Sequence, residues 1–467
     1  MMQTNALYYG DCLDWMQKWD DNSVDLIYLD PPFNSKANYN QLYHTEGADD
    51  EAQYRAFTDT WTWDEAARNR LDTYENAHGR KAHDAIVGLR RILGPSGMLS
   101  YLTYMAERLE HCHRLLKDTG SIYLHCDPTA SHYLKILMDN IYQGGGAFRN
   151  EIVWCYKSGG ASPKKHFSKK HDVILCYAKS GEKCHYNQQL EKSYNRGYKR
   201  YGFKGGKEFC DDVGWYTMVG MKDYWNIDMV GRTSKERLGY PTQKPEALLE
   251  RIIKASSNEG DIVLDPFCGC GTAAAVSQKM KRQFIGIDIS SFAIDLVLEK
   301  RLKDKSIPAY GIPQDFRSAE KLAKEKPFDF ETWAVTRLPG FKANTKQVAD
   351  GGVDGRGRLA DKPDDVELTK LALAQVKGGR YNLSGLRDFI GVTQSKNAAL
   401  GYYITLAPIK SRAAKRNVLD TGRVLISGSS FPRMQLWSMD DYFNKSLPRL
   451  PLMTDPYTGK KMLPQLF

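Results

Sequence analysis

The stretch Val24-Asp25-Leu26-Ile27-Tyr28-Leu29-Asp30-Pro31-Pro32-Phe33 carries the pattern from which the fold and chemistry of this chain are inferred. Its first six residues form the apolar run of a buried strand, and an acid, two prolines and an aromatic ring follow. The Asp30 carboxylate and a nearby backbone carbonyl can accept both hydrogens of an exocyclic amine, because the prolines fix the backbone without adding N–H donors. Phe33 offers a face for a flipped base. The pattern predicts chemistry on a nucleobase amine, and the alternative is an acidic turn with Phe33 in the core.

A second pattern lies far downstream, where Ile262–Leu264 is expected to be a buried strand. The next residues, Asp265-Pro266-Phe267-Cys268-Gly269-Cys270-Gly271-Thr272, predict a glycine-rich turn that opens a helix near Ala273. A further apolar strand over Phe284–Ile287 ends on Asp288. A carboxylate at that place can accept both ribose hydroxyls of a nucleoside cofactor.

The glycine-rich turn also fits a dinucleotide-binding fingerprint, through Gly269, Gly271 and Ala274. That alternative leaves the stretch around Asp30 unexplained. An acid in the turn, Asp265, also suits the ammonium group of a cofactor better than a pyrophosphate. The two patterns together therefore favour S-adenosylmethionine over a dinucleotide.

The paired motifs resemble the DNA methyltransferases that modify exocyclic amines. The order of the motifs, catalytic before cofactor-binding, is similar to that of the circularly permuted beta class. The resemblance covers about Asn5 to Lys303 and implies an α/β, Rossmann-like methyltransferase core with permuted motif order that acts on double-stranded DNA. Further segments also match the family: Gly10-Asp11-Cys12, Gly120–His125, Asn150–Trp154 and Tyr240-Pro241-Thr242-Gln243-Lys244-Pro245.

The resemblance also implies roles for individual residues. In the family, an acid at the position of Asp30 usually accompanies N6-adenine methylation and a serine N4-cytosine methylation, so adenine is expected and cytosine is the alternative. The N6 amine of a flipped base would attack the sulfonium methyl directly, without a covalent enzyme intermediate. Asp30 would raise the electron density on nitrogen and take up a proton late in the step. The catalytic residues expected are Asp30, Pro31, Pro32 and Phe33, and the cofactor-binding residues are Asp11, Thr242, Lys244, Pro245, Asp265, Phe267, Gly269, Gly271 and Asp288.

Length, charge and cysteine usage fit this interpretation. A chain of 467 residues is too long for one compact domain and predicts two or three. The net charge of +10 suits a polyanionic partner, although a merely basic soluble protein would share it. The sequence contains no apolar stretch long enough for a membrane span and no secretion signal at its start. Nine cysteines, an odd number, point to the reducing cytoplasm rather than to a disulfide scaffold.

Two segments of the methyltransferase part carry separate expectations. Residues 34–80 form a polar insertion with Trp61 and Trp63, which is either a mobile flap or a helical cap whose tryptophans pack on the core. Residues 155–239 interleave lysines with aromatic residues, as a DNA-reading segment requires, although a solvated lysine face over a small aromatic core would look similar. The spacing of the histidines and cysteines in this segment argues against zinc. These residues are His166, His171, Cys176, Cys184, His185 and Cys210.

A different pattern begins beyond Lys326. Asp354 stands at a glycine-flanked strand start, and the next strand carries a polar residue, a spacer and a lysine as Gln375-Val376-Lys377. This is the layout of a metal-dependent nuclease, in which Asp354, Gln375 and the Val376 carbonyl bind Mg²⁺. Lys377 would activate water or stabilise the phosphate, and Glu331 could orient a metal-bound water. The stretch from about Phe328 to Asn444 resembles the restriction-endonuclease-like fold of the Mrr type, with glutamine in place of the usual second acid.

We therefore expect two enzymes in one chain, acting on double-stranded DNA in restriction-modification or phage defence. The expected parts are residues 1–154 and 240–326 for the methyltransferase, 155–239 for target recognition, and 327–467 for the nuclease-like domain. Two alternatives for the last part remain open: an ordinary α/β domain, and a nuclease fold that binds DNA without cutting it. A nucleic-acid-binding adaptor is the competing class for the whole chain. A homodimer and separate defence-system subunits also remain open.

Overall fold

The computed structural model describes residues 2–32, 61–77, 79–143, 147–157, 165, 167–202, 206–231, 233–240, 242–344, 352–365, 367–379, 381–454, 456, 461 and 462. The chain divides into two compact units, of which the first comprises Met1–Gln41 and Gln53–Tyr310. The second comprises Leu42–Ala52 and Gly311–Phe467. The division after Tyr310 differs from the expected boundary at Lys326, because the helix at Phe316–Glu325 packs on the helix that follows it.

A nine-stranded sheet forms the centre of the first unit, in the order β12-β1-β11-β10-β2-β3-β5-β4-β9. Strands β12 to β3 in this order are parallel, whereas β5 runs antiparallel to both of its neighbours. The strand bounds are β1 (Ala6–Tyr9), β2 (Val24–Leu29), β3 (Leu116–Cys126), β4 (Phe148–Cys155), β5 (His171–Ala178), β9 (Tyr224–Asn226), β10 (Ile262–Asp265), β11 (Gln283–Asp288) and β12 (Ala309–Tyr310).

Helices cover both faces of this sheet, as a central parallel strand requires. Along β2, Ile27 and Leu29 pack in the cluster that contains α4, whereas Leu26 and Tyr28 pack in the cluster that contains α6 and α7. The helices are α1 (Cys12–Met16), α2 (Glu65–Glu75), α3 (His83–Leu93), α4 (Gly97–Leu115), α5 (Ser131–Ile141), α6 (Glu246–Ser256), α7 (Thr272–Lys279) and α8 (Ser291–Leu296), followed by a π-helical turn at Val297–Arg301.

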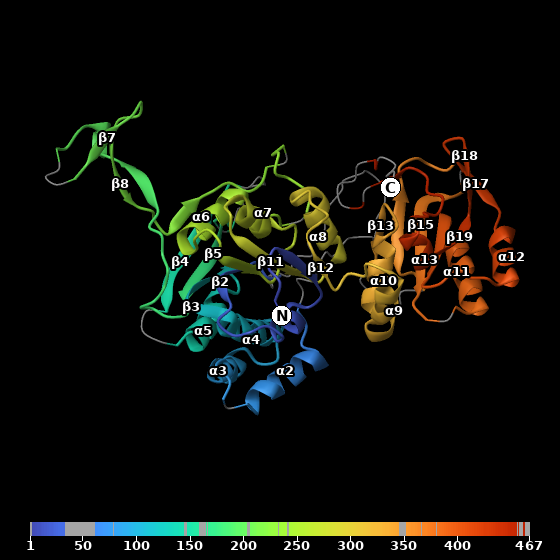
Figure 1. Cartoon of the computed structure of the whole chain (residues 1–467), viewed down its shortest axis with the longest axis horizontal. Helices are drawn as coiled ribbons and strands as arrows, with labels where there is room; N and C mark the ends of the chain where they lie inside the picture. Colours follow the sequence, from blue (N-terminus) through green and yellow to red (C-terminus); the bar gives the residue numbers. More distant parts are fainter. Residues whose placement is uncertain are drawn as a thin grey trace. The chain divides into compact units, whose positions relative to one another are not determined.

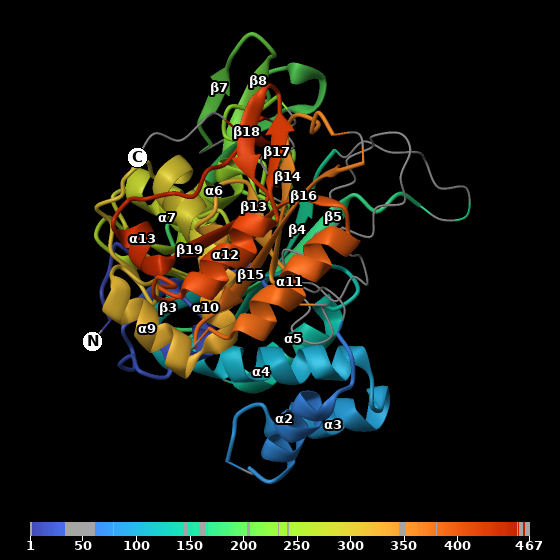
Figure 2. The same ribbon diagram turned by 90° about the vertical axis from the view of Figure 1, so that its right-hand side faces the viewer.

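The described part of the insertion at 34–80 is a helical cap. Figures 1 and 2 show α2 and α3 beside α4, and both helices contact it. Trp61 and Trp63 pack against the core, and the Trp61 ring lies 4.7 Å from the Tyr104 ring. Residues 33–60, including Phe33, lie outside the described residues.

The segment 155–239 is not one structural part. Its strands β5 and β9 belong to the nine-stranded sheet, and only the middle of the segment forms a separate sheet in the order β6-β8-β7. This small sheet consists of β6 (Leu190–Tyr194), β7 (Glu208–Cys210) and β8 (Trp215–Gly220). The separate structure expected for target recognition is therefore confined to about 190–220.

The second unit is also α/β, with a mixed sheet in the order β13-β14-β15-β16-β19 and β20 beside β14. Strand β14 is antiparallel to β15, whereas β15, β16 and β19 are parallel. The strands are β13 (Phe341–Ala343), β14 (Gly355–Leu359), β15 (Thr369–Lys377), β16 (Ala398–Thr405), β17 (Arg423–Ile426), β18 (Ser429–Pro432), β19 (Met434–Ser438) and β20 (Met453–Thr454). The helices are α9 (Phe316–Glu325), α10 (Pro327–Thr336), α11 (Leu383–Ser395), α12 (Arg412–Asp420) and α13 (Met439–Phe443).

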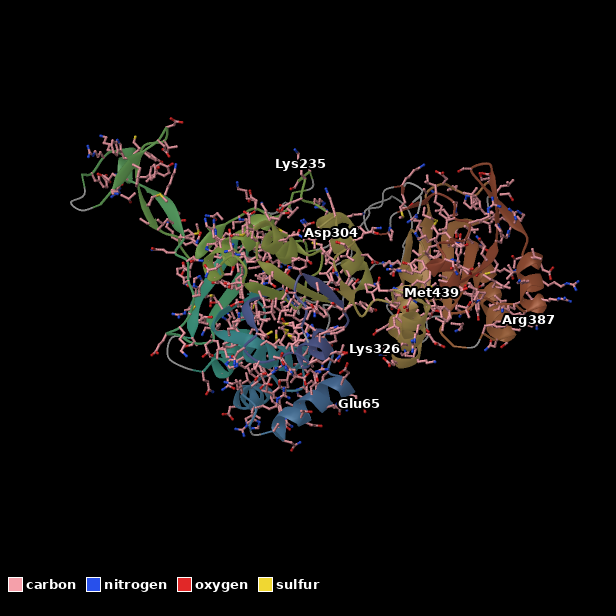
Figure 3. The ribbon with its side chains drawn as sticks, viewed as in Figure 1. Glu65, Lys235, Asp304, Lys326, Arg387 and Met439 are labelled. Atoms are coloured by element: carbon pink, nitrogen blue, oxygen red, sulfur yellow. The ribbon has the colours of Figure 1, made fainter. Side chains whose placement is uncertain are left out.

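Strand β17 forms a hairpin with β18, and β19 rather than β17 pairs with β16. Figure 3 marks Met439, buried at the start of α13, and Arg387, exposed on α11. Among the described residues, none of the helices is both long and apolar enough to cross a bilayer.

Candidate functional site

A pocket of the first unit lies where parallel strands end. It is lined by the residues after β1 and β2, by the turns after β10 and β11, and by the loop before α6. The space is about 970 Å³ when the part open to solvent is included. Ligands of open α/β sheets bind at this edge, because the carboxyl ends of parallel strands meet there. Of the residues predicted for the site, the pocket is lined by Asp11, Asp30, Pro31, Pro32, Thr242, Lys244, Asp265, Phe267, Gly269 and Asp288.

The carboxylate of Asp30 is paired with a lysine from far along the chain. Lys244 Nζ lies 2.5 Å from Asp30 Oδ2, and the two side chains are 9% and 16% exposed. Lys244 also donates to the Thr242 carbonyl at 3.4 Å. Thr242 has a φ of 61°, in the left-handed region, which turns the chain just before Lys244. The loop before α6 therefore contacts the proposed catalytic acid as well as the cofactor pocket.

The turn after β10 needs its glycines. Gly269 and Gly271 have φ values of 48° and 73°, and a Cβ on Gly271 would lie 2.6 Å from Val297 Cγ2. Gly269 N donates to Asp288 Oδ2 at 2.8 Å, and Ser290 N donates to Asp288 Oδ1 at 2.8 Å. The carboxylate of Asp288 thus ties two turns together at the floor of the pocket.

Two acids of the pocket have raised pKa values. Burial raises the pKa of Asp288 to about 6, although the backbone donors of Ser290 and Gly269 lower it. Burial also raises the pKa of Asp265 well above its ordinary value, and the charges of Asp30 and Asp288 add to this. A bound cation or hydroxyl donor would stabilise the ionised form of either carboxylate.

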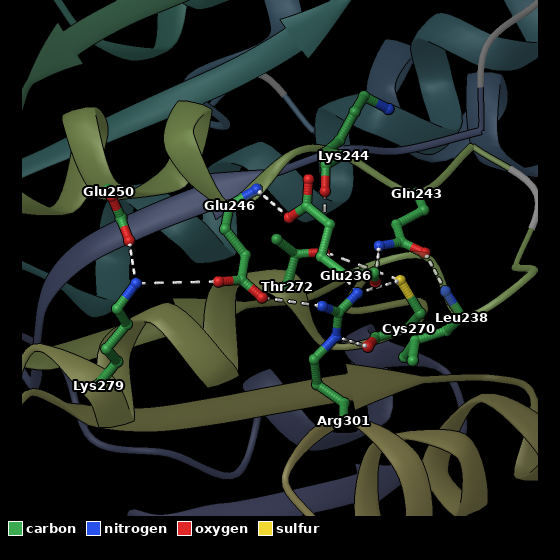
Figure 4. Close-up of polar contacts among 10 residues, drawn as sticks. All are labelled: Glu236, Leu238, Gln243, Lys244, Glu246, Glu250, Cys270, Thr272, Lys279 and Arg301. Atoms are coloured by element: carbon green, nitrogen blue, oxygen red, sulfur yellow. Dashed lines mark hydrogen bonds and ion pairs between the residues drawn. The ribbon is translucent and has the colours of Figure 1, made fainter. Parts of the chain in front are cut away.

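Arg301 contacts the backbone of the glycine-rich turn (Figure 4). Its Nε donates to the Cys270 carbonyl at 3.1 Å, and its Nη1 lies 3.2 Å from Glu246 Oε1. Thr272 Oγ1 donates to the Lys244 carbonyl at 3.2 Å, which joins the start of α7 to the loop before α6. These contacts fix the backbone that carries Lys244 relative to the turn.

Asp11 is oriented by a buried arginine. Arg108 Nη2 lies 2.7 and 2.6 Å from the two oxygens of Asp11, and the guanidinium stacks 3.3 Å from the Tyr104 ring centre. Asp11 also caps α1 by accepting from Leu13 N at 2.9 Å. Asp11 is 43% exposed, so the carboxylate still faces the pocket that it lines.

A second group of polar residues lies behind Asp30. His125, fully buried at the end of β3, places Nδ1 3.9 Å from Asp30 Oδ1 and 3.3 Å from the Tyr28 hydroxyl. Its Nε2 lies 3.1 Å from Asp172 Oδ2, and the Tyr156 hydroxyl donates to Asp172 Oδ1 at 3.2 Å. Sequence patterns did not identify this group.

The separate three-stranded sheet is rich in exposed aromatic and basic side chains. Tyr194, Tyr198 and Phe209 are between 36% and 56% exposed. Lys192 pairs with Asp211 at 2.6 Å, and Arg200 lies over the Trp215 ring at 5.2 Å. Of the basic residues predicted here, Lys199, Arg200 and Lys207 are exposed, whereas Lys164 and Lys204 lie outside the described residues.

In the second unit, the structure brings three of the four predicted residues together. Asp354 Oδ2 accepts from Val376 N at 2.7 Å, between Gln375 and Lys377 on β15. Gln375 Nε2 donates to the Gly352 carbonyl at 2.9 Å, while its buried Oε1 has no hydrogen-bond partner among the described residues. Glu331 lies on α10 beside Phe330, whose ring packs against Gly378 at the end of β15.

The Asp354 carboxylate and the Gln375 side chain are the candidate ligands for one divalent cation in the second unit. The orphaned Gln375 Oε1 and the Asp354 carboxylate are oxygen ligands of the kind that Mg²⁺ takes. Across the described ranges, no group of three or more His, Cys, Asp and Glu side chains is arranged to hold a metal ion. His171, Cys176, Cys184, His185 and Cys210 form no such group, and His166 lies outside these ranges.

Comparisons with known proteins identify relatives of the first unit. A family model described as DNA methylase, of the N6 and N4 type, matches residues 24–299. The DNA adenine methyltransferase YhdJ of Escherichia coli (strain K12) is 29% identical over 325 residues, covering 69% of this chain and 88% of that protein. The Type II methyltransferase M.HpaI of Haemophilus parainfluenzae is 29% identical over 295 residues, covering 63% and 73%.

Two solved structures that are similar in fold both have low TM-scores. The PvuII DNA methyltransferase (cytosine-N4-specific) has a TM-score of 0.39 and 14% identity, covering 66% of this chain and 89% of that chain. The M1.HpyAVI–SAM complex has a TM-score of 0.35 and 17% identity, covering 63% and 98%.

Proposed function

The chain belongs to the DNA methylase family, and from that premise we propose that its first unit methylates N6 of adenine in double-stranded DNA, with S-adenosylmethionine as methyl donor. The observation that carries the proposal is the Asp30 carboxylate, which lines the same pocket as the glycine-rich turn. A methyl donor in this pocket and an amine held at Asp30 would lie within reach of each other. N4 methylation of cytosine is the alternative.

The residues of the pocket support a division of tasks. Lys244 occupies Asp30 Oδ2, which leaves Oδ1 and the backbone beside Pro31 to accept the hydrogens of the amine. The acids Asp265 and Asp288 suit the ammonium and ribose groups of the cofactor, and Asp11 suits its adenine amine. S-adenosylmethionine supplies an electrophilic methyl group when bound. Phe33, the proposed stacking residue, stays a prediction because it lies outside the described residues.

Substitution of Asp30 tests the proposal. Asp30→Ala should abolish methyl transfer to duplex DNA while binding S-adenosylmethionine with near-normal affinity, because the cofactor contacts lie elsewhere. Asp20→Ala, at an exposed acid before β2, is the matched control. Mass spectrometry of digested product DNA should show N6-methyladenine. If N4-methylcytosine alone appears, the alternative holds, and near-normal turnover by Asp30→Ala would refute the catalytic role.

The small sheet β6-β8-β7 is our candidate for reading the target sequence. Basic side chains contact phosphates and aromatic ones stack on or pack against bases, and both kinds are exposed there. Replacing Lys199 and Lys207 by alanine should weaken DNA binding and reduce its salt dependence. S-adenosylmethionine binding should stay unchanged, which separates a DNA-binding defect from a folding defect.

The second unit is our candidate for a Mg²⁺-dependent endonuclease, which would place the chain in restriction-modification or phage defence. The observation that favours it is the orphaned Gln375 Oε1, next in the chain to Val376, whose N–H donates to the Asp354 carboxylate. When bound there, Mg²⁺ would polarise a phosphate oxygen and lower the pKa of a water. Lys377, which follows Gln375 by two residues on β15, would place its ammonium beside the attacked phosphate.

Cleavage assays with supercoiled DNA test this second activity. Asp354→Ala and Lys377→Ala should each remove cleavage that depends on Mg²⁺ and leave methylation unchanged. Arg387→Ala, on the exposed face of α11, is the control. If the intact chain cuts neither modified nor unmodified DNA with any divalent metal, the unit is a DNA-binding domain without catalysis.

A further inference from the structure

A continuous set of polar side chains leads away from the proposed catalytic acid into the sheet. From Asp30 it passes to His125 at 3.9 Å, and from His125 to Asp172 at 3.1 Å. The His125 side chain is fully buried, whereas that of Asp172 is 16% exposed. The path therefore begins at the pocket and ends at a group that reaches solvent.

The hydrogen bonds assign the protons of the His125 ring. Burial raises the pKa of Asp172, but the hydrogen bonds from His125 and Tyr156 and the positive charge of Lys244 outweigh burial, so that its pKa is lowered. An ionised Asp172 can only accept, which means that His125 Nε2 carries a hydrogen. Burial raises the pKa of Tyr28 well above its ordinary value, so its hydroxyl stays protonated and donates to Nδ1. In the neutral ring, the single lone pair of Nδ1 accepts from the Tyr28 hydroxyl, which has to rotate away before Nδ1 can take a proton from Asp30.

Methyl transfer to an amine releases one proton, which must leave the site. The new bond joins the amine nitrogen to the methyl carbon, the bond from that carbon to sulfur breaks, and its electron pair stays on sulfur. The nitrogen then sheds a proton to Asp30, where Oδ2 is occupied by Lys244 and Oδ1 faces His125. For Asp30 to act again, it must lose this proton.

We infer that His125, oriented by Asp172, accepts at Nδ1 the proton that Asp30 takes from the target amine, and releases a proton from Nε2 through Asp172 to solvent. This inference rests on the proposed methyl transfer. The separation of 3.9 Å has to shorten for the transfer, as catalytic contacts do when substrate binds. An imidazolium at this place lies between two carboxylates, Asp30 and Asp172, which stabilise its charge.

Several other groups surround the ring and enter any pH dependence. The edge of the Trp154 ring system meets the imidazole at a centroid distance of 5.4 Å. The titratable and charged neighbours are Tyr28 and Asp30 at β2, Cys126 and Asp127 at β3, Asp172 on β5, Tyr156 after β4, Lys244 before α6 and Asp265 after β10. Of these, only Asp30 and Tyr28 face Nδ1 among the contacts described.

Methylation followed over many turnovers, at saturating S-adenosylmethionine and across a range of pH, tests the inference, because Asp30 must lose its proton between turnovers. His125→Gln should slow turnover about 100-fold, as loss of a general base does, with S-adenosylmethionine affinity within about twofold of normal. The dependence of turnover on pH should change in this variant, because the imidazole that accepts the proton is gone. At fixed pH, its rate should also rise with the concentration of a small buffer base, whereas that of the unmodified protein should not.

The control and the second variant separate this role from a structural one. His132→Gln, at an exposed histidine on α5, should behave as the unmodified protein does. Asp172→Asn should slow methylation and respond to buffer base, because residue 172 no longer fixes the imidazole hydrogen on Nε2. If His125→Gln does not fold, the Asp172→Asn variant tests the inference in its place. An unchanged rate, or a uniform loss at every pH without response to buffer base, overturns the inference. Failure of the unmodified protein to methylate DNA would instead contradict the proposed function.

Discussion

Lys244→Met should destabilise the first unit, because it leaves the Asp30 carboxylate without its cation in a site nearly closed to water. The Nζ–Oδ2 distance is 2.5 Å, and the side chains of Lys244 and Asp30 are only 9% and 16% exposed. Removing one partner of a buried ion pair costs about 3–5 kcal/mol. Since Asp30 keeps its opening to the pocket, we expect a loss of about 2–3 kcal/mol in the free energy of unfolding near pH 8.

The loss should depend on pH with a definite sign. Without the ammonium, burial disfavours the ionised form of the Asp30 carboxyl. The protonated carboxyl is tolerated at low pH, so the cost of an uncompensated buried charge appears as the pH rises. Urea unfolding followed by fluorescence should therefore show a smaller difference between variant and unmodified protein at pH 5 than at pH 8.

A matched variant and a double variant complete the experiment. Lys279 lies 2.6 Å from Glu250, but the two side chains are 61% and 39% exposed, so Lys279→Met should cost at most about 1 kcal/mol. Adding Asp30→Asn to Lys244→Met should restore most of the lost stability, because position 30 then carries no unpaired charge. Equal losses for Lys244→Met and Lys279→Met, or a loss that is the same at both pH values, would refute the reasoning.

Three further predictions concern the cofactor pocket. Gly271→Ala should lower the free energy of unfolding, measured in urea, by about 2–5 kcal/mol. Of this loss, about 1–2 kcal/mol comes from placing alanine at a φ of 73° and about 1–3 kcal/mol from the contact of its Cβ with Val297. A loss below about 1 kcal/mol would contradict this. Burial raises the pKa of Asp288 to about 6, and hydroxyl donors bind the ionised carboxylate. Calorimetry should therefore show that the affinity for S-adenosylmethionine rises from pH 5 to pH 7. Asp288→Asn should remove this pH dependence. Arg108→Lys should weaken S-adenosylmethionine binding about tenfold and leave the single-turnover rate at saturation unchanged, because an ammonium group cannot stack flat on the Tyr104 ring while it pairs with Asp11; equal affinity would argue against the positioning role.

Local patterns were enough to locate the strands that carry the pocket. The apolar runs that end at Asp30, Asp265 and Asp288 are β2, β10 and β11, which lie side by side and parallel. Because parallel strands end at one edge, knowing the ends of three strands was enough to expect their acids in one place. The same reasoning applied to Asp354 and Gln375, since neighbouring antiparallel strands bring a strand start opposite a strand end.

The amino-acid sequence by itself determined which residues end strands, where glycine is needed and which acids meet at the sheet edge, because these follow from short-range pattern and backbone sterics. Only the tertiary structure decided the partners of those acids: Lys244 for Asp30, Arg108 for Asp11, and His125 between Asp30 and Asp172. It also decided that β5 and β9 join the central sheet instead of the recognition segment. The physical reason is that a charge pair or an edge pairing depends on the register of segments far apart in the chain, and no local propensity encodes that register.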